Sequence, residues 1–242
     1  DGSGPRTIGD LSISTSRLSI APDGSQAVFD HGLGEGSGQL EVIDLSTGVV
    51  HTVFDVGQPS GPDWSPDGST IAFSTDSGAL FTTPSGGADS GTPVRDEGDG
   101  RFLEGYEASW SPDGDSLVAV DDAGEVFVVE VDGTSPPRRL TSIGDAGWTD
   151  WGPDGIVVST MVNGSWALYE LDPENGAPPQ LLLDRLGDET APEVSPDGNF
   201  LAFIGIDGEQ QDLFVLDLGS GAVEQLTDDA AQELSPAWIP SS

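Results

Sequence analysis

The chain has 242 residues, with 43 aspartates and glutamates against seven arginines and no lysine, and its formal net charge is −36. Binding to a nucleic-acid backbone or to an anionic membrane surface needs a concentration of basic residues that this composition does not provide. A Walker-type phosphate loop is excluded because it requires a lysine. The absence of cysteine excludes disulfides, zinc–thiolate sites and thiol nucleophiles.

A Pro-Asp-Gly turn recurs along the whole chain. Its prolines are Pro22, Pro66, Pro112, Pro153 and Pro196, and a degraded sixth copy lies at Trp238-Ile239-Pro240. Successive prolines of the six copies are 41 to 46 residues apart. A repeat of this length with four β-like segments is typical of a propeller blade.

Each repeat predicts strands and no helix. The first strand ends in an apolar packing residue just before the turn, at Ile20, Trp64, Trp110, Trp151, Val194 and Trp238. Second strands are expected over residues 70–74, 116–120, 155–160 and 200–204, and third strands over 39–43, 125–131, 166–171 and 212–216. Fourth strands are expected over 138–141 and 223–227.

The repeated residues themselves favour structural roles. The turn aspartates are expected to accept hydrogen bonds from nearby backbone N–H groups; they are Asp23, Asp67, Asp113, Asp154 and Asp197. The four tryptophans of the first strands are expected to pack between blades rather than to form sugar-binding platforms.

These motifs resemble the TolB-like β-propeller repeat. Trp64-Ser65-Pro66-Asp67-Gly68 and Trp110-Ser111-Pro112-Asp113-Gly114 match its turn, Leu140-Thr141 and Leu226-Thr227 match its closing pair, and Ser235-Pro236-Ala237-Trp238 matches its final strand. The resemblance covers essentially the whole chain. It implies an all-β, six-bladed ring in a bacterial or archaeal envelope or an extracellular setting, here without the amino-terminal α/β domain of TolB.

The start of the chain bears on the number of blades. Residues 1–6 align with Asp132–Pro137, the turn that leads into a fourth strand. We therefore expect residues 1–242 to form one propeller domain that is preceded by upstream residues. The sixth blade would be incomplete in this chain, and a five-bladed ring is the alternative.

The sequence offers no catalytic constellation. His31 and His51 are the two histidines, too few for a histidine-rich metal lyase on a related propeller, and there is no Gly-x-Ser-x-Gly nucleophile elbow. We therefore expect a protein that is not an enzyme.

Carboxylates lie close to the packing residue in several first strands. Asp63, Glu107, Asp150 and Glu193 all lie within three residues of it, and first strands surround the channel of a propeller. Gathered carboxylates repel one another unless they bind a cation or take up protons, and oxygen ligands suit calcium. The sequence thus predicts two alternatives, a calcium site in the channel or solvated carboxylates in a wet funnel.

The functional prediction is a non-enzymatic binding or scaffold module. Its channel mouth would present side chains to a protein or peptide partner, and the candidates are Arg17, Tyr106, Glu107, Trp148, Asp150 and Glu193. One alternative is a cation-dependent carbohydrate-binding or enzymatic propeller that uses the same funnel. Another is a structural subunit of a surface assembly.

The excess of negative charge predicts salt-dependent stability. Acidic excess without lysine is the composition expected of a halophilic protein, because the charges repel one another until concentrated salt screens them. We expect the thermal unfolding temperature to rise as NaCl is increased from low to molar concentration. An unfolding temperature that does not change over this range would contradict the hypothesis.

Overall fold

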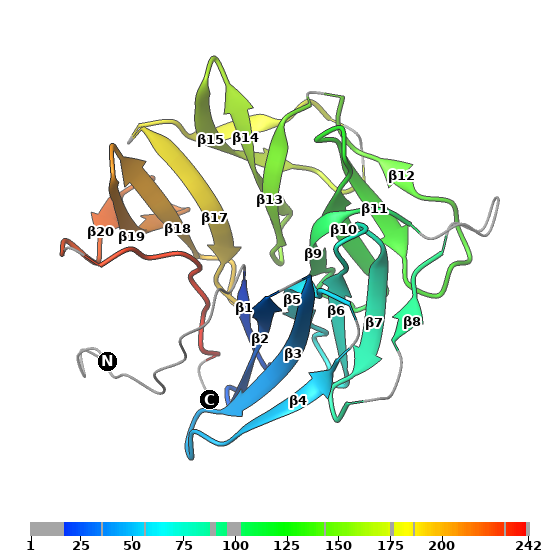
Figure 1. The fold of residues 1–242 in the computed structure, drawn as a ribbon. Helices are drawn as coiled ribbons and strands as arrows, with labels where there is room; N and C mark the ends of the chain where they lie inside the picture. Colours follow the sequence, from blue (N-terminus) through cyan, green and yellow to red (C-terminus); the bar gives the residue numbers. More distant parts are fainter. Residues whose placement is uncertain are drawn as a thin grey trace.

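Five antiparallel four-stranded sheets surround a common axis in the computed structural model, which describes residues 17–240 except 35, 56, 88–90, 96–102, 143, 175–176, 186 and 230 (Figure 1). The first sheet contains β1 (Leu18–Ile20), β2 (Gln26–Gly34), β3 (Ser37–Asp44) and β4 (Val50–Phe54). The second contains β5 (Ser60–Trp64), β6 (Thr70–Ser74), β7 (Leu80–Pro84) and β8 (Thr92–Pro93). The third contains β9 (Tyr106–Trp110), β10 (Ser116–Val120), β11 (Val126–Glu130) and β12 (Arg138–Arg139). The fourth contains β13 (Ala146–Trp151), β14 (Ile156–Val162), β15 (Ser165–Leu171) and β16 (Gln180–Leu183), and the fifth β17 (Asp188–Val194), β18 (Phe200–Asp207), β19 (Gln210–Asp217) and β20 (Val223–Gln225).

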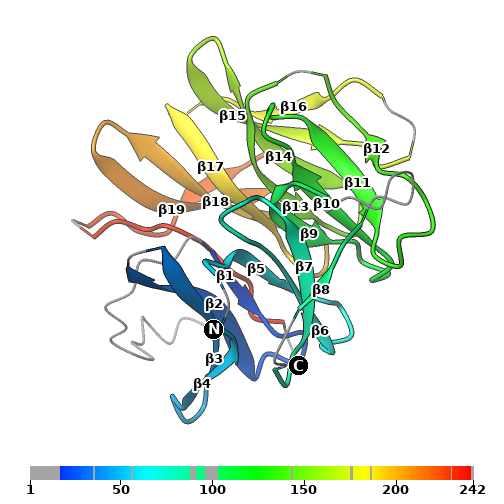
Figure 2. The same ribbon diagram turned by 45° about the vertical axis from the view of Figure 1, so that its right-hand side comes forward.

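The first strand of each sheet is the innermost one. β1, β5, β9, β13 and β17 contact one another in that order and converge at the centre of the molecule (Figure 2). The Pro-Asp-Gly turns join first to second strands at one end of the ring, which we call the turn end. The hairpins between second and third strands lie at the other end, which we call the hairpin end. No helix occurs among the described residues, so none there is long and apolar enough to cross a membrane.

The prediction of six blades is wrong, because the described residues form five complete sheets and no part of a sixth. The carboxyl-terminal copy of the repeat supplies a packing residue but forms no strand. Residues 231–240 instead run as an extended segment between the fifth sheet and the first (Figure 1). The alignment of residues 1–6 with a fourth strand falls outside the described residues.

Contacts of this last segment explain why its sequence matches the repeat. Trp238 Nε1 donates a hydrogen bond to the backbone oxygen of Glu193 at 2.8 Å. Trp110 Nε1 makes the equivalent bond to the backbone oxygen of Asp63 at 3.1 Å. Trp238 therefore packs against the preceding blade as a blade tryptophan does, although no further strands follow it.

Hydrophobic clusters fill the four seams between consecutive sheets, and the packing residues lie in them. Trp64 packs with Val28, Trp110 with Ala72 and Trp151 with Val118, in each case across a seam. The structural role predicted for these tryptophans is confirmed.

The turn aspartates also have the predicted role, with one exception. Asp113 accepts hydrogen bonds from Ser111 Oγ (2.6 Å) and from the backbone N–H of Asp115 (3.1 Å). Equivalent bonds to a backbone N–H are made by Asp23, Asp67 and Asp197. Gly114, which follows Asp113, has φ = 77°, a conformation that glycine adopts without strain.

Asp154 is the exception because its turn is shorter. Six residues separate Trp110 from its strand partner Leu117, but only four separate Trp151 from Ile156. The glycine that follows Asp154 is not left-handed, and Asp154 itself makes no hydrogen bond within the described part of the chain.

Substitution of these two aspartates separates the bonded turn from the shortened one. We expect Asp113→Ala to lower the free energy of unfolding by about 1 kcal/mol, because the hydrogen bonds of an exposed turn are lost. Asp154→Ala serves as the matched control and should leave stability unchanged. Chemical denaturation measures both, and equal losses would contradict this account.

Candidate functional site

Side chains on the first strands link neighbouring blades around the axis. In the first four blades, the residue before the packing position accepts a backbone N–H from the packing residue of the next blade. Asp63 Oδ2 accepts from Trp110 at 2.9 Å, and Asp150 Oδ2 accepts from Val194 at 2.8 Å. These two predicted site residues therefore hold blades together.

Two serines at the same repeat position complete this series. Ser19 Oγ accepts the backbone N–H of Trp64 (3.2 Å), and Ser109 Oγ accepts that of Trp151 (3.2 Å). Each serine also donates to a carboxylate of the next blade, Ser19 to Asp63 at 2.8 Å and Ser109 to Asp150 at 3.0 Å. Neither serine was predicted as a site residue, although both occupy the repeat position of Asp63 and Asp150, and this was the signal in the sequence.

Arg17, next to β1, lies inside the ring. Its Nη2 contacts Asp150 Oδ1 and Glu193 Oε2, each at 3.4 Å. Its Nη1 donates to the backbone oxygens of Ala108 (3.4 Å) and Thr149 (3.3 Å). One buried guanidinium thus joins the first blade to the third, fourth and fifth.

The charges on the axis do not balance. We use the name axial cluster for Arg17 together with Asp63, Glu107, Asp150 and Glu193. Burial works against the charged form of Arg17, but these four carboxylates together raise the pKa of its guanidinium. One positive charge therefore stands among four acidic groups.

Burial shifts three of the acids toward the protonated form. It raises the pKa of Glu193 well above the ordinary value, and Asp150 adds to that rise while Arg17 opposes it. Burial also raises the pKa values of Asp150 and Glu107, again against Arg17. Glu107 Oε2 is buried without a hydrogen-bond partner in the described structure, which is consistent with a side chain that is costly to ionise.

A narrow pocket at the axis adjoins Arg17. Arg17, Trp148 and Glu193 contribute to its lining, and Ser235 and Pro236 of the last segment form another part of it. Its free volume of about 10 Å³ is room for roughly one water molecule. Arg17, which contacts three blades across the ring, therefore obstructs the axis at this level.

The predicted mouth residues are only partly brought together. Arg17, Trp148 and Glu193 line the axial pocket, and Asp150 contacts Arg17. Tyr106 lies instead beside Gly78 in the neighbouring blade.

The predicted calcium ligands lie around a guanidinium. Among the described residues no three acidic or histidine side chains form a group that could hold a metal ion. Calcium binding stays a prediction, and the position of Arg17 between Asp150 and Glu193 gives it no support.

Comparison with known proteins places the fold. No protein family model and no curated protein matches the chain. Among solved structures, a putative TolB from Agrobacterium tumefaciens has a TM-score of 0.76 and 21% identity, over 92% of this chain and 83% of that one. TolB from Acinetobacter baumannii has a TM-score of 0.82 and 19% identity, over 100% of this chain but only 61% of that one. An oligogalacturonate lyase in complex with manganese has a TM-score of 0.63 and 15% identity, over 93% of this chain and 69% of that one. These likenesses show a TolB-like propeller fold, and because the fold also carries a lyase it does not by itself decide the function.

Replacement of Arg17 tests whether the carboxylates of the axial cluster depend on its positive charge. At pH 7 we expect Arg17→Met to lower the free energy of unfolding by about 3 kcal/mol, because buried carboxylates lose their counter-charge. The pKa values of Glu193, Asp150 and Glu107 should rise further in the folded variant. The variant should then lose stability relative to the native protein as pH rises above about 4.5, where these acids ionise in the unfolded chain.

Arg138→Met is the matched control, because Arg138 is exposed and the same charge is removed. Chemical denaturation from pH 4.5 to 8 at constant salt measures both variants. Stability differences that do not change with pH, or an equal loss in both variants, would contradict a buried, under-neutralised cluster.

Proposed function

We propose that this propeller is a non-enzymatic binding module that holds a protein or peptide partner at its hairpin end. The observation that carries the proposal is the obstructed axis. The guanidinium of Arg17 lies on the axis and contacts three blades there, so the rim rather than the channel is the surface offered to a partner.

Apolar side chains at the hairpin end are suited to such contacts. Met161 and Val162 are 41% and 39% exposed at the tip of the β14–β15 hairpin. Beside them Trp148 and Trp166 pack edge to face, with ring centroids 5.5 Å apart. Aromatic and methionine side chains are enriched in protein interfaces. The net charge of −36 favours a partner that is basic.

The alternative of an enzyme or a carbohydrate-binding funnel has less support. It requires an open channel with reactive groups, whereas the axis is obstructed by an ion-paired arginine. His31 and His51 lie on β2 and β4 of the first sheet, outside the axial cluster. His31 Nδ1 lies 2.9 Å from Glu41 Oε2.

The proposal extends to the setting of the protein. The resemblance to TolB-like repeats favours an envelope or extracellular location, and the lysine-free acidic composition favours concentrated salt. A structural subunit of a surface assembly would use the same faces, with a second copy of the chain as the partner.

Site-specific photo-crosslinking tests the proposal. A photo-reactive amino acid at Met161 should give a discrete adduct with another protein in the source cells. The same group at Thr47, which is exposed at the turn end, is the matched control and should give none. Mass spectrometry identifies the adduct, and a self-adduct would indicate the structural subunit instead. No adduct at Met161, or the same adducts at both positions, would contradict the proposal.

A further inference from the structure

One seam of the propeller contains a small packing residue where the other three contain tryptophan. Trp64, Trp110 and Trp151 fill the first three seams, and Val194 takes the equivalent place between the fourth and fifth sheets. The strand registers show the equivalence. Ala72, the strand partner of Asp63, faces Trp110 of the next sheet. Val157, the strand partner of Asp150, faces Val194 of the next sheet in the same way.

A pocket of about 170 Å³ lies in this seam at the turn end. Val157 and Leu182 of the fourth sheet and Val194 and Leu218 of the fifth form its apolar walls. The shortened turn contributes as well, because Gly152 takes the place of a serine and Val194 packs directly against it. The replacement of an indole ring by an isopropyl group thus accounts for the space.

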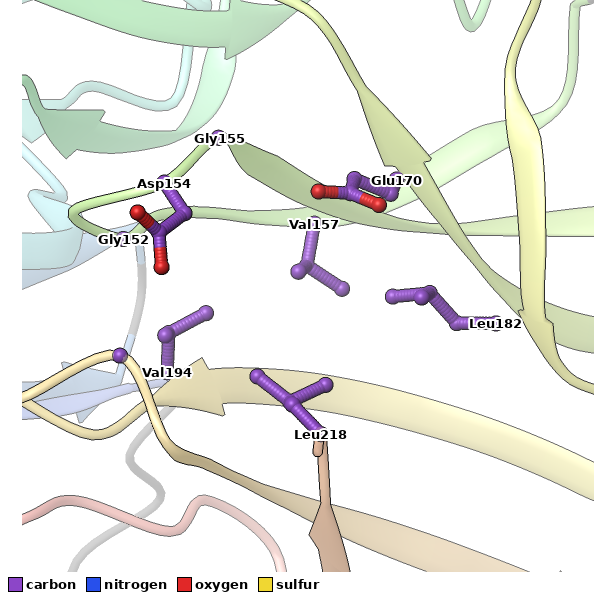
Figure 3. Close-up of a pocket in the computed structure, with 9 residues that line it drawn as sticks. Gly152, Asp154, Gly155, Val157, Glu170, Leu182, Val194 and Leu218 are labelled. Atoms are coloured by element: carbon purple, nitrogen blue, oxygen red, sulfur yellow. The ribbon is translucent and has the colours of Figure 1, made fainter. Parts of the chain in front are cut away.

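Two carboxylates border the apolar walls. Figure 3 shows Asp154 and Glu170 on either side of Val157, with Val194 and Leu218 opposite. An added Cβ at Gly198 of the fifth blade would lie 3.0 Å from Asp154 Oδ2, so Asp154 reaches across the seam. Glu170 is the strand partner of Val157 and lines the pocket beside it. Neither side-chain carboxylate makes a hydrogen bond to any described residue, and no basic residue lines the pocket.

We propose that this pocket binds a small aromatic ammonium ion. A dry cavity of about 150 Å³ suffices to bind benzene, so the space suits one aromatic ring. A flat ring is the shape that tryptophan presents to the other three seams. The ammonium group would meet Asp154 and Glu170, whose oxygens accept charge-assisted hydrogen bonds. This site lies at the end of the ring opposite the proposed partner surface and does not depend on it.

Three probe molecules separate the ring from the charge. We expect 2-phenylethylamine to bind with one-to-one stoichiometry in isothermal titration calorimetry. n-Butylamine lacks the ring and 3-phenylpropionate reverses the charge, so each should bind at least about tenfold more weakly. Equal affinity for all three probes, or no binding of 2-phenylethylamine at millimolar concentration, would overturn the proposal.

Variants then locate the site. Val194→Trp should fill the pocket and abolish binding while thermal unfolding shows an intact fold. Asp154→Asn and Glu170→Gln should each weaken binding about threefold, as partly exposed ion pairs do. Asp76→Asn removes an equal charge from an exposed turn of the second sheet and should change nothing. Affinity retained in Val194→Trp, or lost equally in Asp76→Asn, would overturn the assignment.

A measurement on the native protein covers the case in which Val194→Trp does not fold. In methyl-resolved NMR, 2-phenylethylamine should shift the methyl signals of Val157, Val194 and Leu218. Shifts confined to other methyl groups would place the ligand elsewhere and overturn the proposal.

Discussion

The ring depends on hydrogen bonds that each first strand accepts from the next. Asp63 and Asp150 receive the backbone N–H of Trp110 and Val194, and Ser19 and Ser109 do the same for their neighbours. Burying these N–H groups without acceptors would cost more than the bonds themselves contribute. Carboxylates are strong acceptors, but at the axis they accumulate charge of one sign. Arg17 offsets that charge, so this residue next to β1 affects the electrostatics of three other blades.

Much of the fold could be predicted from the repeated turn. The strands over residues 70–74 and 116–120 have the predicted bounds, because Pro-Asp-Gly sets the turn and the apolar run after it sets the strand. The number of blades could not be predicted in the same way. Trp238 repeats the packing contact of Trp110, so counting packing residues gave six where the described sheets number five.

The candidate site was predicted only in part, because the sequence shows the position of a residue along its strand but not the reach of its side chain. Positions near the packing residue could be assigned to the axis, and Arg17, Trp148 and Glu193 do line its pocket. Which of them would be buried depended on how far each side chain reaches across the ring. The guanidinium of Arg17 contacts the third, fourth and fifth blades and so lies on the axis where a funnel was expected. The two-residue shortening of the turn at Asp154 was visible in the sequence, because the apolar run begins at Ile156 directly after Gly155.

The seam that contains Val194 also differs mechanically from the other three. Its packing residue presents fewer side-chain atoms than an indole ring does, and dispersion forces between sheets grow with the number of atoms in contact. Of the four seams filled by hydrophobic clusters, the one between the fourth and fifth sheets is therefore expected to gain most from a larger packing residue. A side chain that filled this seam would strengthen the attraction between these two sheets without changing the other three seams.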